Sequence, residues 1–410
     1  MNVLKAEIKI VYNIIKRFWA HKNIHDYANN KNLKKVVAKI NKIINKNNEK
    51  YEYAKRLRDT LFSLQDGHLR LIVPQNEGGC YYKSGIYFKE FKEGIGIINV
   101  DPAMYGDELK KSLIGSIIIK INDNLVNDYI NNFTLKPGST KDHIKANAIS
   151  ALSYQELLPS EDPYPQTIVL TNAVGKKRRI NLKWYKINKL TTYKCLSMED
   201  ISKNTGLLRV KSFYKIDELG CLSTISFLKE VKQILPLFQD KNTIIIDLRE
   251  NCGGIDDQAQ ILASIFINTN KEWLFYKHND SWMKYKQDDL LIDYLIADKW
   301  LNESVTIHKI YILISSKTYS TAEIFAHFFK NHFKAIFIGQ PTGGGAGNPI
   351  TFRLPYSGLQ IQVPVTQFYT NRLSNKTIET NPIIPDIEVI PSIDDFIKGE
   401  DTSLREIISM

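Results

Sequence analysis

Ser320 is the residue of this chain best placed to act as a nucleophile. It follows the apolar run Ile310–Ser315 and precedes a segment with helical spacing that begins at Ala322. A serine at a strand-to-helix corner holds its hydroxyl at the positively polarised helix N-terminus, where an alkoxide and a tetrahedral oxyanion are both stabilised. Serine is also a favoured helix cap, and the corner alone favours capping.

Three further patches carry residues suited to acyl transfer. Asp66-Gly67-His68 closes an N-terminal helical region and supplies an imidazole. A buried strand at 244–248 ends in Cys252-Gly253-Gly254, whose glycines permit backbone amides to face a developing oxyanion. Glu379 lies in a late proline-bounded loop and supplies a carboxylate. Each patch alone has an ordinary explanation, as a structural histidine, a glycine turn or a rigid loop.

Composition restricts the class of protein that has to position these residues. The chain has 410 residues, 43% of them hydrophobic, which suffices for two or three domains with a substantial core. The net charge of +11 is spread along the chain rather than clustered, so we expect no nucleic-acid partner. The cysteines show no metal-ligand spacing and are expected to be buried thiols, and we expect no cofactor and no metal.

The hydrophobic pattern changes twice along the chain. Residues 1–75 show apolar residues at helical spacing and predict a helical domain that ends in the Asp-Gly-His motif. Residues 79–187 show short strand-like runs, with helical insertions expected around 141–157. Residues 200–395 alternate strands with helices, which predicts an α/β layer with parallel pairing, and 396–410 form a tail. No stretch has the length and apolarity of a membrane span.

Taken in order, the patches resemble the C-terminal processing (tail-specific) peptidases and the tricorn-core-type serine peptidases. The resemblance rests on the Asp247-Leu-Arg-x-Asn-x-Gly-Gly turn, the Ser320-x-Ala-Glu helix start and the Glu379-x-x-x-Ile-x-Pro-Asp-Ile segment. It implies a crotonase-like ββα spiral core of the ClpP/crotonase superfold. It also implies that residues 79–187 are a small, degenerate PDZ-like β-rich domain.

The resemblance implies a Ser-His-Glu triad rather than a serine–lysine dyad. The position that holds lysine in one branch of the family is occupied here by Gly345, whereas Ser320, His68 and Glu379 fit the other branch. The implied oxyanion donors are the amides of Thr321 and of Gly253 or Gly254. A serine precedes the histidine in the tricorn pattern, and Gly67 stands there in this chain, which leaves Glu379 to orient the base.

We therefore expect a serine endopeptidase that cleaves protein or peptide substrates through an acyl-enzyme, as a possible homo-oligomer. Two alternatives remain: a catalytically inactive ligand- or peptide-binding protein on the same fold, and a crotonase-type acyl-CoA enzyme. The N-terminus lacks a signal-type apolar core, so a cytoplasmic location is expected. The cell envelope or secretion is the alternative if a signal peptide has been removed.

Overall fold

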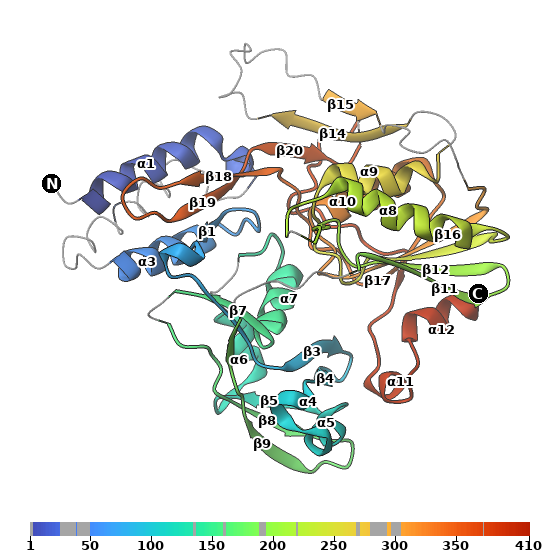
Figure 1. The fold of residues 1–410 in the computed structure, drawn as a ribbon, viewed down its shortest axis with the longest axis horizontal. Helices are drawn as coiled ribbons and strands as arrows, with labels where there is room; N and C mark the ends of the chain where they lie inside the picture. Colours follow the sequence, from blue (N-terminus) through green and yellow to red (C-terminus); the bar gives the residue numbers. More distant parts are fainter. Residues whose placement is uncertain are drawn as a thin grey trace.

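The computed structural model shows three groups of elements arranged around one central sheet (Figure 1). It describes residues 3–24, 38, 50–133, 137–158, 161–187, 194–218, 220–267, 271–278, 293–296, 305–371 and 373–410. Residues 25–37 and 39–49 of the predicted helical domain at 1–75 therefore lie outside the described residues. None of the helices in these ranges has the length and hydropathy needed to cross a membrane.

The central sheet has six strands in the order β11-β12-β13-β16-β17-β21. The strands are β11 (Leu196–Ser202), β12 (Thr205–Val210), β13 (Thr243–Asp247), β16 (Lys309–Ile314), β17 (Ile336–Gly339) and β21 (Ile387–Glu388). The pair β11–β12 is antiparallel, and every other pair is parallel. The α/β fold expected from the alternating pattern is confirmed. Parallel strands place their carboxyl ends at one edge, where the polar turn after β13 and the Ser320 corner after β16 both lie.

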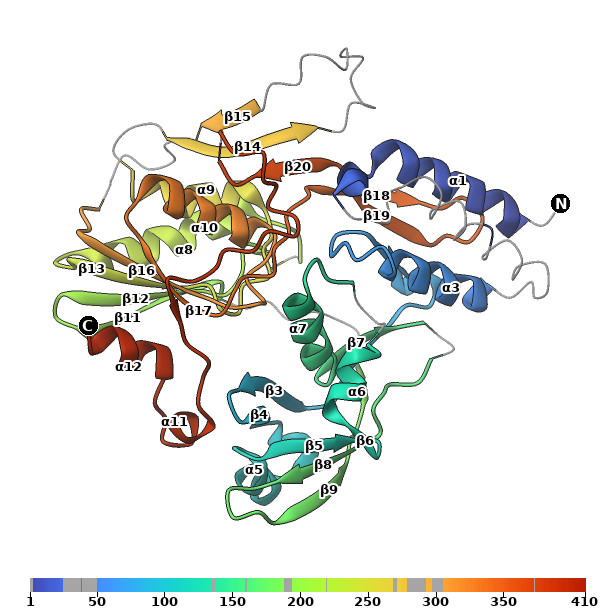
Figure 2. The same ribbon diagram turned by 180° about the vertical axis from the view of Figure 1, so that it is seen from behind.

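Side chains alternate between the two faces of this sheet. In β16, Ile310, Ile312 and Ile314 belong to one core cluster, whereas Tyr311 and Leu313 belong to another. The first face is covered by α8 (Thr224–Ile234), α9 (Asp256–Ser264) and α10 (Thr321–His332), as Figure 2 shows from behind. The second face receives α12 (Thr402–Ile408). Because both faces are buried, these strands read as continuous apolar runs in the sequence.

The N-terminal elements share a core with strands from the end of the chain. They are α1 (Val3–Phe18), η1 (Ala20–Asn23), α3 (Lys50–Phe62) and β1 (Arg70–Ile72). Their apolar faces pack with β18 (Pro349–Arg353) and β19 (Gln360–Pro364) in one cluster, and β1 pairs antiparallel with β19. This packing fixes the loop between α3 and β1, which carries His68, against the C-terminal half of the molecule.

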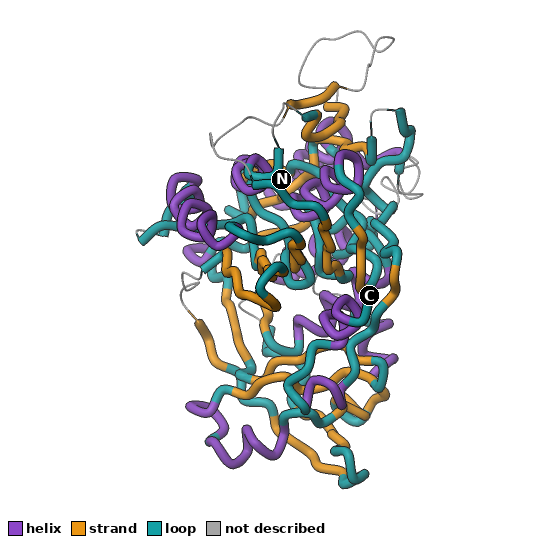
Figure 3. The backbone as a smooth tube through the Cα atoms, turned by 90° about the vertical axis from the view of Figure 1, so that its right-hand side faces the viewer, coloured by secondary structure: helices purple, strands orange, loops and turns teal. Residues whose placement is uncertain are grey.

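A β-rich region lies below the central sheet in Figure 1 and at the lower end of the molecule in Figure 3. Its main sheet has the order β3-β4-β5-β8-β9, formed by β3 (Ile86–Phe91), β4 (Gly94–Val100), β5 (Ile117–Ile121), β8 (Thr167–Thr171) and β9 (Lys177–Asn181), with β6 (Asn124–Leu125) paired to β5. Its helices are α4 (Pro102–Tyr105), α5 (Asp107–Leu113), α6 (Val126–Asn131) and α7 (Lys141–Ala151). The region has its own apolar cluster, between residues 86 and 182.

The expected helical insertion at 141–157 is only partly correct. Helix α7 ends at Ala151, and β7 (Tyr154–Leu157) pairs with β2 (Cys80–Lys83), which also pairs with β10 (Tyr185–Ile187). Gln155 and Leu157 of β7 are buried while Tyr154 is exposed, the alternation typical of a half-buried strand. The run is too short to show its period against the preceding helical pattern.

The remaining elements complete the described chain. They are η3 (Gln75–Glu77), η4 (Leu235–Phe238), β14 (Glu272–His278), β15 (Asp293–Ile296), β20 (Thr366–Tyr369) and α11 (Ile393–Ile397). The prediction of buried thiols holds for Cys80 and Cys195 but is wrong for Cys221 and Cys252, which are exposed. Both exposed cysteines lie in turns, where the surrounding chain does not cover them.

Candidate active site

Ser320 is held in a backbone conformation that frees its hydroxyl. Its φ of 59° and ψ of −128° are unusual for a residue with a side chain, and such strain is characteristic of functional positions. The Ser320 amide donates to the Gly345 carbonyl at 2.8 Å. Its side chain makes no capping hydrogen bond to α10, and Oγ instead lies 3.0 Å from Nε2 of His68. Helix capping therefore does not explain this serine.

His68 is a buried, neutral imidazole. Its side chain is only 5% exposed, and its amide donates to Asp66 Oδ1 at 2.9 Å, which fixes the loop before β1. Burial outweighs the nearby Asp66 charge and lowers the pKa of His68 to about 4. At neutral pH the ring is therefore in the form that can accept a proton from Ser320.

The second ring nitrogen of His68 faces a tyrosine hydroxyl. Nδ1 lies 3.2 Å from Tyr319 Oη, and the two rings stack with centroids 4.8 Å apart. Tyr319 Oη in turn lies 2.6 Å from Ser139 Oγ, which also accepts from the Gly67 amide at 3.3 Å. Burial raises the pKa of Tyr319 well above its usual value, so this hydroxyl stays protonated. The chain Ser320–His68–Tyr319–Ser139 thus contains no carboxylate.

Glycines make room for the Tyr319 ring. A Cβ at Gly67 would lie 2.1 Å from Tyr319 Oη, and a Cβ at Gly345 would lie 2.4 Å from the same atom. These are the positions that hold serine and lysine in the two patterns used above for comparison. The ring of Tyr319 leaves no room for a serine at position 67 or a lysine at position 345. The same ring therefore accounts for the glycine at both positions.

Glu379 lies in a buried charged cluster beside this chain. Its carboxylate is 3.6 Å from His21 Nδ1, which donates a 2.9 Å hydrogen bond to Asp66 Oδ2. Trp19 Nε1 donates to the same Asp66 oxygen at 2.7 Å. Although burial opposes the charge, Asp66 and Glu379 together raise the pKa of His21 to about 9. His21 is therefore an imidazolium between two carboxylates.

The structure thus brings His68 and Ser320 into direct contact and places Glu379 differently from the sequence expectation. The side-chain hydrogen bonds of the His68 ring go to Ser320 and Tyr319, while Glu379 faces His21. Asp66, which precedes the histidine by two residues, connects the two groups because it binds the His68 amide and the His21 ring.

His21, Asp66 and Glu379 are also the described residues whose side chains could ligate a cation, since one atom from each lies within 4.8 Å of the others. Ligands about 2.0 Å from a tetrahedral zinc ion lie roughly 3.3 Å apart. The 2.9 Å contact between His21 and Asp66 is shorter and is an ordinary charge-assisted hydrogen bond. The geometry of His21, Asp66 and Glu379 therefore fits a hydrogen-bonded charged cluster better than a metal site.

The glycine turn after β13 lies against Ser320 and the start of α10. A Cβ at Gly253 would lie 2.6 Å from Ser320 Cβ and 3.0 Å from the Thr321 amide nitrogen, so this turn packs directly on Ser320. The Gly253 amide already donates to Asn251 Oδ1 at 2.8 Å. Within the described part of the chain, the amides of Gly254 and Thr321 donate to no acceptor. These two amides remain available for a ligand oxygen.

Glu323, in the first turn of α10, fixes the turn beneath Ser320. Its buried carboxyl accepts from the Gly344 amide at 2.5 Å, next to the Gly345 carbonyl that receives the Ser320 amide. Burial raises the pKa of Glu323 to about 8. The Ala-Glu pair of the serine motif therefore supports the backbone that holds Ser320 in its strained conformation.

Sequence reasoning missed Tyr319, Ser139 and His21. Tyr319 directly precedes Ser320. The only sign of its ring in the sequence is the glycine at positions 67 and 345, where a side chain would collide with the ring. Ser139 and His21 come from segments with no motif, and their approach depends on tertiary packing. No local pattern indicates either residue.

The chain matches one known family. Residues 204–389 match the profile described as Peptidase family S41. The matched segment contains the central sheet from β12 to β21, the glycine turn and Ser320. Residues 204–389 are therefore a peptidase domain of the C-terminal processing peptidase family, and the protein is a serine-type peptidase.

Solved structures share the fold over nearly the whole chain. The structure of mature CPAF in complex with lactacystin superposes with a TM-score of 0.76 at 13% identity, covering 99% of this chain and 96% of that one. A putative peptidase from Parabacteroides merdae gives 0.55 at 15% identity, with coverage of 98% and 95%. The photosystem II D1 C-terminal processing protease gives 0.52 at 15%, with coverage of 94% and 93%.

Proposed function

We propose that this protein hydrolyses peptide bonds with Ser320 as the nucleophile and His68 as the general base. The observation that carries the proposal is the 3.0 Å contact between Ser320 Oγ and His68 Nε2, made by a serine whose side chain forms no capping hydrogen bond to α10. The base is neutral at physiological pH because burial depresses its pKa. A nucleophile paired with a base of this kind is the arrangement that acyl transfer requires.

The proton moves along a defined path in this mechanism. Nε2 of His68 takes the Ser320 proton as Oγ bonds to the peptide carbonyl carbon, and returns it to the leaving amine as the C–N bond breaks. This role requires hydrogen on Nδ1, which donates to Tyr319 Oη, and Tyr319 then donates to Ser139. Water repeats the sequence on the acyl-enzyme and releases the carboxylic acid product.

Glu379 acts in this proposal through charge rather than through a hydrogen bond to the base. Asp66 and Glu379 carry two negative charges and His21 one positive charge, so the buried cluster has a net charge of −1. The charge of Asp66 favours the His68 imidazolium that forms during attack, the charges of His21 and Arg70 oppose it, and Glu379 offsets the charge of His21. The carboxylate need not contact the ring for this effect, because charges interact strongly in a low-dielectric interior.

The oxyanion is proposed to bind the amides of Thr321 and Gly254. Thr321 N–H lies at the N-terminus of α10, where the helix dipole adds to the attraction. Thr321 Oγ1 donates to the Gly254 carbonyl at 3.0 Å, which ties the two segments together. Of the two glycines considered from the sequence, Gly254 is favoured because the Gly253 amide already binds Asn251.

We further propose that the core at 200–395 winds as the crotonase-like ββα spiral, and that residues 79–187 are a degenerate PDZ-like module. The strand–helix alternation of the core and the separate apolar cluster of the β-rich region support these assignments. Homo-oligomer formation and a cytoplasmic location remain predictions.

Cleavage of unfolded casein by the full chain tests the proposed function. Wild-type protein should release peptides, and Ser320→Ala and His68→Ala should each abolish release while circular dichroism remains unchanged. Acyl-CoA thioesters, tested in parallel, should not be consumed. Casein cleavage that survives in the Ser320→Ala protein would remove this serine from its role.

A further inference from the structure

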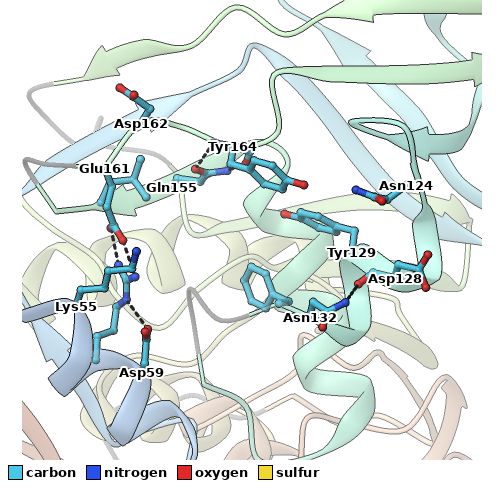
Figure 4. Close-up of a pocket in the computed structure, with 13 residues that line it drawn as sticks. Lys55, Asp59, Asn124, Asp128, Tyr129, Asn132, Gln155, Glu161, Asp162 and Tyr164 are labelled. Atoms are coloured by element: carbon cyan, nitrogen blue, oxygen red, sulfur yellow. Dashed lines mark hydrogen bonds and ion pairs between the residues drawn. The ribbon is translucent and has the colours of Figure 1, made fainter. Parts of the chain in front are cut away.

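A large cavity lies between helix α3 and the β-rich region, away from the residues assigned to catalysis. Its volume is about 790 Å³. Figure 4 shows that α3 contributes one wall, and that the opposite wall comes from α6 and the segment around residue 164. Ligand sites occur preferentially at such junctions between structural units. No step of the proposed hydrolysis uses this cavity.

Aromatic side chains line the middle of the cavity. Tyr129 and Tyr164 stack with ring centroids 6.0 Å apart and an interplanar angle of 17°, and the Phe133 ring lies 6.2 Å from that of Tyr129. Tyr164 is 43% exposed as a residue, so part of its surface is accessible to a ligand. Gln155 holds this ring in place because it accepts from the Tyr164 amide at 3.1 Å.

The Tyr129 hydroxyl is a buried polar group without a partner. Tyr129 is only 8% exposed, and its hydroxyl makes no hydrogen bond to any residue that the structure describes. Figure 4 shows this hydroxyl pointing into the cavity, toward the wall formed by α3. A buried hydroxyl left unbonded costs about 1–3 kcal/mol, so a ligand that supplies the missing bond is favoured.

The charges around the cavity select a cation. Arg58 is already engaged, because it donates to both carboxylate oxygens of Glu161 at 2.6 and 2.7 Å. Among the remaining lining groups, Lys55 is the one cation, whereas Asp128 and Asp162 make no ion pair with any described residue. In Figure 4 these two carboxylates lie on opposite sides of the aromatic group.

We propose that this cavity binds the lysine or arginine side chains of a basic peptide segment. An exposed tyrosine face binds ammonium or guanidinium groups by cation–π attraction, the Tyr129 hydroxyl accepts a hydrogen bond from them, and the rim carboxylates complete the site. The volume accommodates more than one side chain, which favours a peptide over a small amine. The identification of this segment as part of a protein substrate rests on the proposed peptidase function. The binding of a basic peptide does not depend on that function.

The positive net charge of the protein helps to distinguish specific binding of a basic peptide from nonspecific electrostatic attraction. The whole chain carries +11, so a cationic peptide is repelled by the molecule in general. Binding of such a peptide therefore reports a local negative site rather than nonspecific attraction.

Fluorescence anisotropy with the full-length Ser320→Ala protein tests the proposal without hydrolysis. The probe is fluorescein-labelled Ala-Arg-Ala-Arg-Ala, and the matched probe replaces both arginines by neutral citrulline. We expect Kd for the arginine peptide to be at least tenfold lower than for the citrulline peptide. Asp128→Asn with Asp162→Asn should remove this preference, and Tyr129→Phe should weaken arginine-peptide binding several-fold.

The control variant removes two charges elsewhere on the β-rich region, through Asp107→Asn with Glu108→Gln at the start of α5. It should leave binding unchanged. Equal binding of the two peptides, or equal losses in the control and cavity variants, would overturn the proposal. Binding of spermidine, measured by isothermal titration calorimetry, with no measurable binding of the arginine peptide would overturn the peptide assignment and assign the cavity to a free polyamine. Because anisotropy reports binding rather than cleavage, these outcomes are independent of whether Ser320 is the nucleophile.

Discussion

Replacing Tyr319 by phenylalanine tests how the base is oriented. The substitution keeps the ring that stacks on His68 and removes only the hydroxyl that lies 3.2 Å from His68 Nδ1. In the proposed transition state His68 is positively charged, so the lost bond is a charge-assisted one. A hydrogen bond to a charged group contributes about 1.5–3 kcal/mol.

This free energy converts directly into an expected rate. At about 1.4 kcal/mol per factor of ten, Tyr319→Phe should lower kcat/KM by roughly 10- to 150-fold. The loss should appear mainly in kcat, because Tyr319 is buried behind the base and does not face a bound substrate. Removing an acceptor from the imidazolium also lowers the pKa of His68 further, so the acid limb of the pH profile should not move upward.

The assay is steady-state cleavage of a fluorogenic peptide between pH 4 and pH 9, with thermal unfolding measured on the same preparations. Ser139→Ala is the matched control, because it removes the next group in the chain and should lower kcat/KM less than Tyr319→Phe. Wild-type kcat/KM in a folded Tyr319→Phe protein would refute the proposed role, and would leave another group to orient His68.

Four further predictions follow from the site. Gly67→Ala places a Cβ 2.1 Å from Tyr319 Oη and should lower kcat/KM about tenfold or more, measured with the same peptide; an unchanged rate would show that the ring moves without consequence. Glu379→Gln should leave weak activity, because it removes charge from the cluster and no hydrogen bond from the base; full activity in kinetic assays would exclude this charge effect. The wild-type rate should fall as pH drops toward 4, where His68 becomes protonated, and an acid limb near pH 6.5 would contradict its burial. Because the pKa of His21 is raised to about 9, its stabilisation is complete below about pH 6.5 and is lost as pH rises through 9. Urea unfolding should show this decline in the wild type and a flatter dependence in His21→Gln.

The fold of the core was predictable because its strands have two buried faces. Continuous apolar runs such as β13 and β16 are visible in the sequence, and the helices between them show their own spacing. The corner at Ser320 and the glycine turn follow from these strands, since both lie at carboxyl ends of the same sheet. The local hydrophobic pattern of the sequence was sufficient to predict the core strands, the Ser320 corner and the glycine turn.

The surroundings of the base could not be predicted in the same way. Tyr319 reaches His68 only because glycines at 67 and 345 leave space for its ring, and those glycines are distant in sequence. The partner of Glu379, His21, arrives through the packing of α1 on β19. Contacts of this kind depend on long-range packing, which leaves no periodic trace in a single sequence.

Mass-spectrometric mapping of a fluorophosphonate adduct tests the central claim most directly, because it reports which hydroxyl is nucleophilic. The account predicts one adduct in wild-type protein, on the tryptic peptide that contains Ser320, and a strongly reduced labelling rate in His68→Ala. An adduct on a different serine, or labelling of Ser320 at the same rate without His68, would contradict it.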